Sequence, residues 1–435
     1  MDASNQVMTV TIEKLIDGGA GLGRVDGQVI FVPGVAPGER VRARVMAIKS
    51  GYAEAVLEAV ETPSADRIDP PCPLVGQCGG CQWQHLAYPA QLQAKVEILR
   101  EDLRRLAKLD APDVLAPIGA PNPYDYRTRI QVKINASQPA PAMGFFAARS
   151  GRLVPMERCL VAAPALNHAV TVLRKLLTDP SRRLPSMTDV HLHLAQGTGE
   201  LQCRHFAKGE PKKRVEAFLA GAVDALPELV SQVYYDHSGH RRVWGRDWIT
   251  DRLHDRPFRI SDRSFAQVNW AQNQVMINTV LTVAALTGRE AVLELFCGIG
   301  NFGLFLADRA ATLSGYDENP SAIADARYNA KQQGKANCRF EAGPVGEVLA
   351  GLIKSGRQFD LALLDPPREG VQHAALKTLI KLQPRRIIYV SCVPSTLARD
   401  LRRLSDGGYR VGRIQPLDLF PQTPYLETVT ELILM

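Results

Sequence analysis

The segment LELFCGIGNFGLFLA at residues 293–307 decides the fold class of the second half of this chain. It consists of a short apolar strand, a turn rich in glycine and an apolar helical stretch. Glycine lets a backbone turn tightly and approach a ligand closely, and Gly298, Gly300 and Gly303 complete the spacing G-x-G-x-x-G. A tight turn without a ligand can have the same spacing, so the neighbouring segments have to decide what this turn does.

Strands and helices alternate regularly around this segment, from about residue 261 to the end of the chain. The apolar runs AVLELF, LSGYD, LALLD and RIIYVS indicate strands, with helical stretches between them. Such alternation predicts a doubly wound, mostly parallel α/β sheet, in which ligands bind at the carboxyl ends of the strands. Five side chains fall at or near these ends: Glu294, Phe296, Asp317, Asp365 and Cys392.

Two acidic residues in this half indicate what kind of ligand the sheet binds. Asp317 ends the strand after the glycine turn, where a carboxylate accepts hydrogen bonds from the ribose hydroxyls of NAD or of S-adenosylmethionine. The spacing does not choose between these two cofactors. Asp365 precedes two prolines, which stiffen the backbone and help to fix where this side chain points. Similar acidic Pro-Pro runs occur in amino-methylating enzymes, where they hold an exocyclic amino group.

Cys392 and Glu427 favour a different methyl acceptor. Cys392 lies in YVSCVPSTLARDL and Glu427 lies in PYLETVTEL. A thiolate that adds to carbon 6 of uracil makes carbon 5 nucleophilic toward a methyl sulfonium, and a carboxylate then removes the proton from carbon 5. Because a free cysteine has a pKa of about 8.5, the site has to lower that pKa or the substrate has to assist. An isolated cysteine at a strand end is often only a small buried residue, and Cys203, Cys297 and Cys338 are interpreted in that way.

Four further cysteines have the spacing of a metal site. Cys72, Cys78 and Cys81 lie in PCPLVGQCGGCQWQH, and Cys159 follows in ERCLVAAP. Four thiolates bind either zinc or an iron–sulfur cluster, and the spacing does not separate the two. Cys203 is the alternative fourth ligand, and a set of free structural thiols is the alternative to a metal site.

Residues 8–60 predict a small β-barrel, because short alternating apolar runs are separated by Gly-Gly, Asp-Gly and Pro-Gly turns. Arg40, Arg42 and Arg44 alternate with apolar residues, so on a strand the three cations share one face. The chain carries a formal net charge of +7 and has a pI of about 9.0, which favours a polyanionic partner such as RNA. The alternative is a solvated β-module with ordinary surface charge.

The length of 435 residues suits two or three domains, and a hydrophobic content of 46% provides for sizeable cores. No apolar run approaches the roughly 20 residues that span a bilayer, and the first ten residues lack the pattern of a secretory signal. We therefore expect a cytoplasmic protein with no membrane partner. In that compartment the eight cysteines are expected to be free, metal-bound or catalytic rather than paired in disulfides.

Together these motifs resemble the RNA 5-methyluridine methyltransferases, and most of all the bacterial subgroup that modifies 23S ribosomal RNA. The resemblance covers nearly the whole chain. It implies a TRAM-like, OB-like β-barrel that binds RNA at residues 1–62, and a central α+β domain with an iron–sulfur cluster and an RNA-binding surface at residues 63–260. Residues 261–435 then form a Rossmann-like catalytic domain that uses S-adenosylmethionine.

The resemblance also implies a role for each motif residue. The ligands of a 4Fe-4S cluster correspond to Cys72, Cys78, Cys81 and Cys159. The S-adenosylmethionine site corresponds to the motifs FAQVNW and LELFCGIGNF and to two acids at strand ends, which gives Gln267, Phe296, Asn301, Asp317 and Asp365. The nucleophile corresponds to Cys392, and the general base corresponds to Glu427.

We therefore expect methylation of carbon 5 of a uridine in 23S rRNA through a covalent cysteine–uracil adduct, with no obligate protein partner. Departures from the family pattern leave the nucleophile and the base intact. The family usually has Asn where Val393 stands, and it often has His-Thr-Ala-His where Gln422, Thr423, Pro424 and Tyr425 stand. These positions bear on the shape of the loops and on the choice of target uridine.

Two rival hypotheses belong to other classes of function. An RNA amino-methyltransferase would use the motif that begins at Asp365, but it would leave Cys392 and Glu427 without a role. A non-catalytic rRNA-binding assembly factor, or a redox sensor based on the cysteine cluster, would bind RNA without trapping it covalently. The departures at Val393 and Tyr425 are the observations that favour lost activity.

Overall fold

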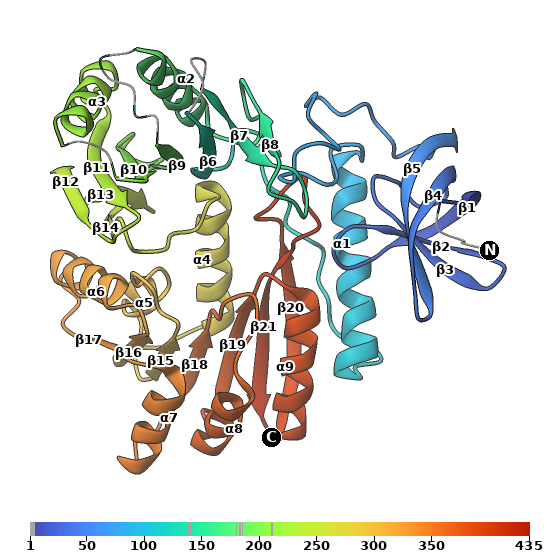
Figure 1. Ribbon diagram of the computed structural model, residues 1–435. Coiled ribbons are helices and arrows are strands. Elements are labelled where there is room, and N and C mark those ends of the chain that lie inside the picture. The colour runs from blue at the N-terminus through green and yellow to red at the C-terminus, as the bar shows by residue number, and fades with distance from the viewer. Residues whose placement is uncertain (1–4, 137–140, 180, 182–183, 185, 210–211) are drawn as a thin grey trace.

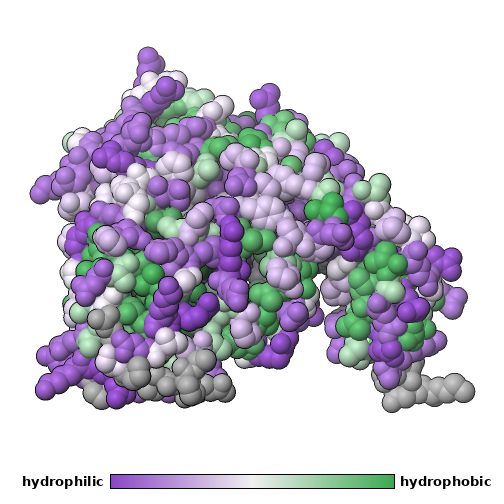
Figure 2. All heavy atoms as spheres, turned by 90° about the horizontal axis from the view of Figure 1, so that it is seen from above, coloured by the Kyte–Doolittle hydropathy of each residue, from purple (hydrophilic) through white to green (hydrophobic). Residues whose placement is uncertain are grey.

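Three bodies of secondary structure follow one another along the chain in the computed structural model (Figure 1). A β-barrel comes first, then a sheet with two helices packed on it, and then a second sheet with helices on both faces. The structure describes all residues except 1–4, 137–140, 180, 182–183, 185 and 210–211. In the view from above, the barrel forms a separate lobe, and most of the visible surface is hydrophilic (Figure 2). Across the described residues, no helix is long and apolar enough to cross a membrane.

The barrel is closed, with the strand order β1-β2-β3-β5-β4, as the sequence predicts. Its strands are β1 (Val7–Leu15), β2 (Gly21–Val25), β3 (Gln28–Val32), β4 (Arg40–Lys49) and β5 (Tyr52–Thr62). Alternate residues of β4 point into the core, so its three arginines share the outer face. Each arginine has an acidic partner on β5: Arg40 pairs with Glu61, and Arg42 and Arg44 pair with Glu58. The barrel therefore partly neutralises this basic stripe itself.

A long helix connects the barrel to the rest of the molecule. After the loop that carries three cysteines, α1 (Tyr88–Asp102) has a proline as its second residue, where the missing N–H is harmless because it lies in the first turn. The helix continues into a π-helical turn, η1 (Leu103–Ala107). The helix α1 contacts both β1 and the last helix, α9 (Pro394–Asp406). It therefore joins the barrel directly to the C-terminal sheet.

The central sheet has seven strands in the order β12-β11-β10-β9-β6-β7-β8. These strands are β6 (Arg129–Asn135), β7 (Ala142–Phe146), β8 (Leu153–Pro155), β9 (Met187–Leu194), β10 (Leu201–Ala207), β11 (Leu229–Asp236) and β12 (Arg241–Gly245). Two helices, α2 (Pro164–Thr178) and α3 (Lys212–Ala225), share an apolar core with one face of this sheet. A hairpin of β13 (Trp248–Leu253) and β14 (Arg256–Ser261) then leads into the second sheet.

The C-terminal sheet has the order β17-β16-β15-β18-β19-β21-β20. Its strands are β15 (Ala291–Leu295), β16 (Thr312–Asp317), β17 (Cys338–Ala342), β18 (Leu361–Leu364), β19 (Arg386–Ser391), β20 (Tyr409–Leu417) and β21 (Glu427–Leu434). The first five strands in this order are parallel, and β21 runs antiparallel to both of its neighbours. The predicted doubly wound and mostly parallel sheet is confirmed.

Helices cover both faces of this sheet, so two apolar cores form. The helices are α4 (Trp270–Ala284), α5 (Gly303–Leu306), α6 (Pro320–Gln332), α7 (Val345–Lys354), α8 (His373–Leu382) and α9. Val292 and Leu363 belong to one core, whereas the next residues along each strand, Leu293 and Leu364, belong to the other. The helix after the glycine turn is a single turn, shorter than the apolar stretch predicts.

Candidate active site

The register of two neighbouring strands brings Cys392 and Glu427 together. Ser391, at the end of β19, pairs with Thr428 of β21 in the antiparallel ladder, so the adjoining residues Cys392 and Glu427 lie across from each other. The hydroxyl of Thr428 donates to the carbonyl of Ser391 at 3.2 Å and reinforces this alignment. The carboxyl group of Glu427 is almost fully buried, whereas Cys392 is half-buried and accessible.

Asp365 completes this group at the end of β18, the strand next to β19. Burial raises the pKa of Asp365 to about 7, and the charge of Asp317 adds to the effect. Burial also raises the pKa of Glu427 well above its usual range, with Asp365 adding and Arg368 opposing. Burial, followed by the charges of Glu427 and Asp365, raises the pKa of Cys392 to about 12. Without substrate, the thiol is therefore held in its protonated form.

The glycine turn lies at the same edge of the sheet. Phe296, Gly298 and Gly300 have φ angles of 62°, 54° and 85°, which bend the chain sharply after β15. The carboxylate of Asp317 accepts hydrogen bonds from the N–H of Gly298 at 2.9 Å and from that of Asn319 at 2.8 Å. Asp317 thus braces the turn, and each of its oxygens retains a lone pair for a further donor.

Asn301 and Gln267 both lie near the start of α4. The amides of Asn301 and Asn273 exchange two hydrogen bonds, at 2.8 and 3.0 Å, so the side chain of Asn301 is tied to α4. Gln267 is half-buried in the segment between β14 and α4. The carbonyl of its neighbour Val268 accepts from the N–H of Thr128, which directly precedes β6, at 2.8 Å, so the backbone beside Gln267 is anchored.

Glu294 is a buried acid at this edge that the site predictions left out. Its side chain is 1% exposed; one carboxyl oxygen accepts from the N–H of Gly303 at 3.1 Å, and the other is buried without a hydrogen-bond partner. Burial, with the charges of Asp365 and Asp317, raises the pKa of Glu294 to about 8. We call Glu294, Asp317, Asp365, Cys392 and Glu427 the thiol–carboxylate edge. Its surplus of acids suits a cationic ligand.

A cavity of about 590 Å³ is lined by the loop that carries three cysteines, by the central sheet and by Arg368 and Tyr425, but by none of the five residues of the thiol–carboxylate edge. Four cationic side chains line it, and such a group suits a phosphate backbone: Arg127, Arg129, Arg158 and Arg368. Arg368 lies over the ring of Tyr425 at 4.2 Å and donates to its hydroxyl at 3.3 Å. Phe265, another lining residue, is 59% exposed. The cavity thus combines cations with accessible aromatic faces, a combination that nucleotides fit.

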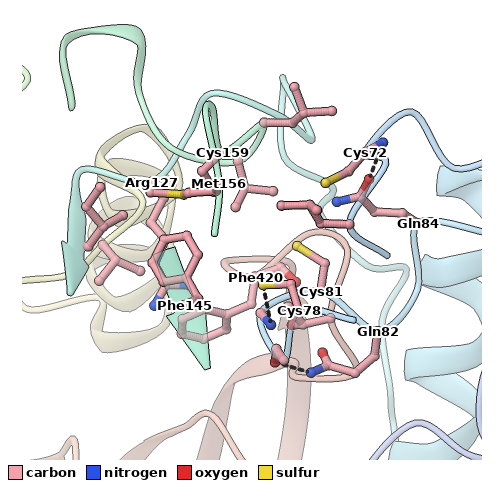
Figure 3. Close-up of a pocket in the computed structure, with 18 of the residues that line it drawn as sticks. Cys72, Cys78, Cys81, Gln82, Gln84, Arg127, Phe145, Met156, Cys159 and Phe420 are labelled. Carbon is pink, nitrogen blue, oxygen red and sulfur yellow. Dashed lines mark hydrogen bonds between the residues drawn. The ribbon is translucent and has the colours of Figure 1, made fainter. Parts of the chain in front are cut away.

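The same cavity has a cysteine wall, formed by Cys72, Cys78, Cys81 and Cys159 (Figure 3). Burial raises the pKa of Cys81 to about 12, and the nearby thiols of Cys159, Cys78 and Cys72 add to this effect. Among the residues that the structure describes, no group of three or more His, Cys, Asp or Glu side chains is arranged to hold a metal ion. The four sulfurs therefore face one space without forming a finished ligand set.

Cys203, the alternative fourth ligand, lies elsewhere, and so does His85, whose imidazole is another side chain that can bind zinc. Cys203 is buried in the core between the central sheet and its helices, and it does not line the cavity. His85 is buried, and its Nε2 lies 3.1 Å from the carbonyl of Val35 in the barrel. We call residues 72–83 the cysteine loop. Glycine is required at Gly79 of this loop because its backbone lies against Phe146 and Ala148, where a side chain would meet their atoms at 3.0 Å. Cys159, unlike Cys203, thus lines the same cavity as the three clustered cysteines.

Comparisons with known proteins agree with this arrangement. Residues 87–434 match the family described as tRNA (Uracil-5-)-methyltransferase, and residues 4–57 match the TRAM domain. A protein of Halalkalibacterium halodurans described as an uncharacterized RNA methyltransferase is 37% identical over 98% of this chain and 97% of its own length. One of Listeria monocytogenes with the same description is 36% identical, with 98% of each chain covered.

A solved structure is similar over the full length. The Pyrococcus abyssi tRNA (uracil-54, C5)-methyltransferase, in complex with S-adenosyl-L-homocysteine, superposes with a TM-score of 0.75 at 27% sequence identity. The alignment covers 98% of this chain and 100% of that chain. The barrel, the central sheet and the C-terminal sheet therefore recur together in that structure.

Proposed function

The chain belongs to the tRNA (uracil-5-)-methyltransferase family, and we propose that it methylates carbon 5 of a uridine in 23S rRNA with Cys392 as nucleophile and Glu427 as general base. The observation that carries the proposal is the strand register that sets Cys392 opposite Glu427, with Asp365 beside them. An amino-methyltransferase would need Asp365 alone and would give no reason for this pairing.

The chemistry assigns one step to each group. After the thiol of Cys392 has given its proton to water, its sulfur forms a bond to carbon 6 of uracil, and the π electrons of the C5–C6 bond become an enolate. S-adenosylmethionine, when bound, supplies the methyl group that carbon 5 takes up. Glu427 then removes the proton from carbon 5, the C5–C6 double bond re-forms, and the bond from carbon 6 to sulfur breaks. Cys392 leaves as a thiolate, so the nucleophile is regenerated.

The raised pKa of Cys392 fits a nucleophile that is activated only when the site is complete. In the substrate-free protein, burial and two carboxyl groups disfavour the thiolate. A cationic methyl donor beside Asp365, Asp317 and Glu294 would offset the negative charge of these acids and so favour the thiolate. Arg368 works in the same direction, because its charge lowers the pKa of the thiol.

We propose that Gln267, Phe296, Asn301, Asp317 and Asp365 hold S-adenosylmethionine. In support, these residues come from the glycine turn, the α4 segment and two strand ends that border one edge of the sheet. Asp317 has free lone pairs for ribose hydroxyls, and the acids of the thiol–carboxylate edge complement a positive charge. The buried Glu294 adds to that complementarity.

The cysteine wall is proposed to hold a 4Fe-4S cluster. Four thiols from two segments face one cavity, and glycine lets the loop approach β7 closely; both features suit a group ligated by thiolates. The cluster would be structural, because methyl transfer requires no electron. Its ligands would tie the loop of residues 72–81 to the central sheet through Cys159.

We also propose that the chain divides into a barrel at residues 1–62, a central domain at 63–260 and a catalytic domain at 261–435, and that all three contact RNA. A target uridine has to leave its stack to meet both the thiol and the methyl donor. The exposed ring of Phe265, and the exposed Arg368, whose charge acts on Cys392, support contact with such an extruded base. The similar Pyrococcus protein acts on uracil 54 of tRNA, so tRNA is the substrate to test against rRNA.

A methylation assay tests this proposal. Labelled S-adenosylmethionine is given with 23S rRNA transcript or with tRNA to wild type, Cys392→Ala and Glu427→Gln. We expect 5-methyluridine from wild type, no transfer by Cys392→Ala, and a covalent RNA adduct that accumulates with Glu427→Gln. Methyl on an exocyclic nitrogen with an active Cys392→Ala would favour the amino-methyltransferase. Transfer to tRNA alone would correct the substrate, and binding without transfer would favour an assembly factor.

A further inference from the structure

The segment of residues 418–426, which leads into Glu427, is held by three separate parts of the molecule. It connects β20 to β21 and so precedes the proposed base directly. We call it the base-leading segment. The base-leading segment contacts the cysteine loop, α1 and a loop of the barrel. It therefore connects these three parts to Glu427 of the thiol–carboxylate edge.

Gln422 is the centre of these contacts. Its carbonyl accepts hydrogen bonds from the N–H groups of Gln82 and Trp83, both at 3.0 Å, which ties it to the cysteine loop. Its N–H donates to the side chain of Gln91 in α1 at 3.0 Å, and its own side-chain oxygen accepts from Gln91 at 2.9 Å. Gln91 also donates to the carbonyls of Trp83 and Leu86.

The backbone of Gln422 is left-handed, which is uncommon for a residue other than glycine. Its φ angle is 69°, and the residue is only 2% exposed. At a helix end or an exposed turn such a conformation costs little, but in a buried segment between two strands the surroundings have to hold it. The four hydrogen bonds to the loop and to α1 supply that constraint.

A buried ion pair fixes the start of the same segment. Lys95 of α1 lies 2.6 Å from Asp418, and both side chains are fully buried. Lys95 also donates to the carbonyl of Phe420 at 3.1 Å. The helix α1 therefore holds the base-leading segment at two places, through Lys95 and through Gln91.

The barrel loop between β1 and β2 contacts the segment that follows Cys392 and the segment that precedes Glu427. The indole of Trp83 donates to the carbonyl of Gly19 at 3.0 Å, and a side chain at Gly19 would meet Pro424 at 3.1 Å. In addition, the hydroxyl of Ser395 donates to Asp17 at 3.0 Å. Ser395 follows the nucleophile closely, and Pro424 precedes the base, so the barrel contacts both ends of the reacting pair.

We propose that Gln422 is a positioning residue for Glu427, and that it makes removal of the carbon 5 proton depend on the docking of the cysteine loop and the barrel. This inference rests on the proposed function. Gln422 does not touch the reacting atoms; it acts through the covalent path to Glu427. A misplaced base slows the last step, while the attack of Cys392 on carbon 6 proceeds as before.

The test measures adduct formation and adduct resolution separately in single turnovers with RNA substrate. Gln422→Gly keeps the left-handed backbone accessible and removes the side-chain bond to Gln91. We expect it to form the covalent adduct at a rate within about twofold of wild type and to resolve it on the order of 10- to 100-fold more slowly. The methylated adduct then accumulates, a signature that a loss of folding does not produce.

The chain offers a matched control in Gln383, an exposed glutamine with a φ angle of 52° at the end of α8. Gln383→Gly should leave both rates unchanged. Gln91→Leu removes both hydrogen bonds between Gln91 and Gln422, and it should slow resolution of the covalent adduct as Gln422→Gly does. If Gln422→Gly does not fold, Gln422→Asn, which also tolerates a left-handed φ, replaces it.

Equal losses in formation and resolution, or no change in either rate, would overturn the positioning role. A wild-type protein that forms no adduct with RNA would instead refute the proposed function, so the two failures are distinguishable.

Discussion

The thiol–carboxylate edge and the cysteine wall are built in opposite ways. The edge is set by strands in register, so Cys392 and Glu427 face each other before any ligand arrives. The wall is set by loops, and its four thiols face one space without a finished metal geometry. A hydrogen-bonded ladder fixes positions by itself, whereas loops that carry metal ligands depend on the metal for their final arrangement.

The largest expected effect concerns the cysteine wall, where the loss of one thiol should abolish most of the binding of an iron–sulfur cluster. After reconstitution with iron and sulfide under anaerobic conditions, wild type should bind iron, and Cys81→Ser should lose most of it. The control Cys338→Ser changes a half-buried cysteine in β17 and should keep its iron. Iron per chain and the visible absorbance are measured. Zinc uptake or no metal uptake by wild type would contradict the cluster.

The second effect concerns the edge, where a buried acid should make stability depend on pH. The pKa of Glu294 is about 8 in the folded chain, against about 4.3 when unfolded, so folding favours its protonated form. As pH rises from about 4 to about 8, the unfolded carboxyl ionises first and the folded state loses stability. Glu294→Gln should therefore be more stable than wild type at pH 8, on the order of a few kcal/mol, and equal to it near pH 4.

An exposed acid gives the opposite sign and serves as the control for Glu294. Hydrogen bonds from the hydroxyl and backbone of Thr287 lower the pKa of Glu290 to about 2. Glu290 thus stabilises the folded state at pH values above the pKa that it has in the unfolded chain. This stabilisation is lost as the pH falls toward 2. Glu290→Gln should be less stable than wild type at pH 7, and thermal unfolding across pH 4–8 compares the two variants. A gain for Glu294→Gln that does not grow with pH would contradict the assignment.

The smallest effect tests whether the charges at the edge act on the thiol. Glu427→Gln keeps the size of the side chain but removes a charge that raises the pKa of Cys392, so alkylation of Cys392 by iodoacetamide should become about 2- to 10-fold faster at pH 9. Arg368→Gln should slow alkylation, and by less, because Arg368 is exposed and its charge is screened by solvent. The rate is measured on peptides containing Cys392. No change in the alkylation rate of either variant would show that burial alone sets the pKa of Cys392.

Local patterns were sufficient to predict much of the fold. Apolar runs between helical stretches predicted the C-terminal sheet, and turns around alternating residues predicted the barrel. The predictions of the sheet and the barrel succeed because periodicity and turn chemistry act over a few residues. Cys72, Cys78, Cys81 and Cys159 line one cavity, and their role as ligands of one metal group stays a prediction.

Long-range pairings escaped prediction. Nothing in the neighbourhood of Arg42 indicates that its charge is met by Glu58 on the next strand. The same holds for Lys95 and Asp418, which come from distant segments and neutralise each other in the interior. The buried Glu294 was noticed at a strand end, but its pKa depends on how completely the chain encloses it.

The sequence by itself determined the class of each part, the motif residues and the chemistry that a cysteine and a glutamate can perform on uracil. Only the tertiary structure decided how these residues meet: β21 between β19 and β20 sets Glu427 against Cys392, and Gln422 links that base to the cysteine loop and α1. The physical reason is the separation along the chain over which each effect acts. Side-chain periodicity is local, whereas strand order, burial and the electrostatics of enclosed groups depend on contacts between segments far apart in the chain.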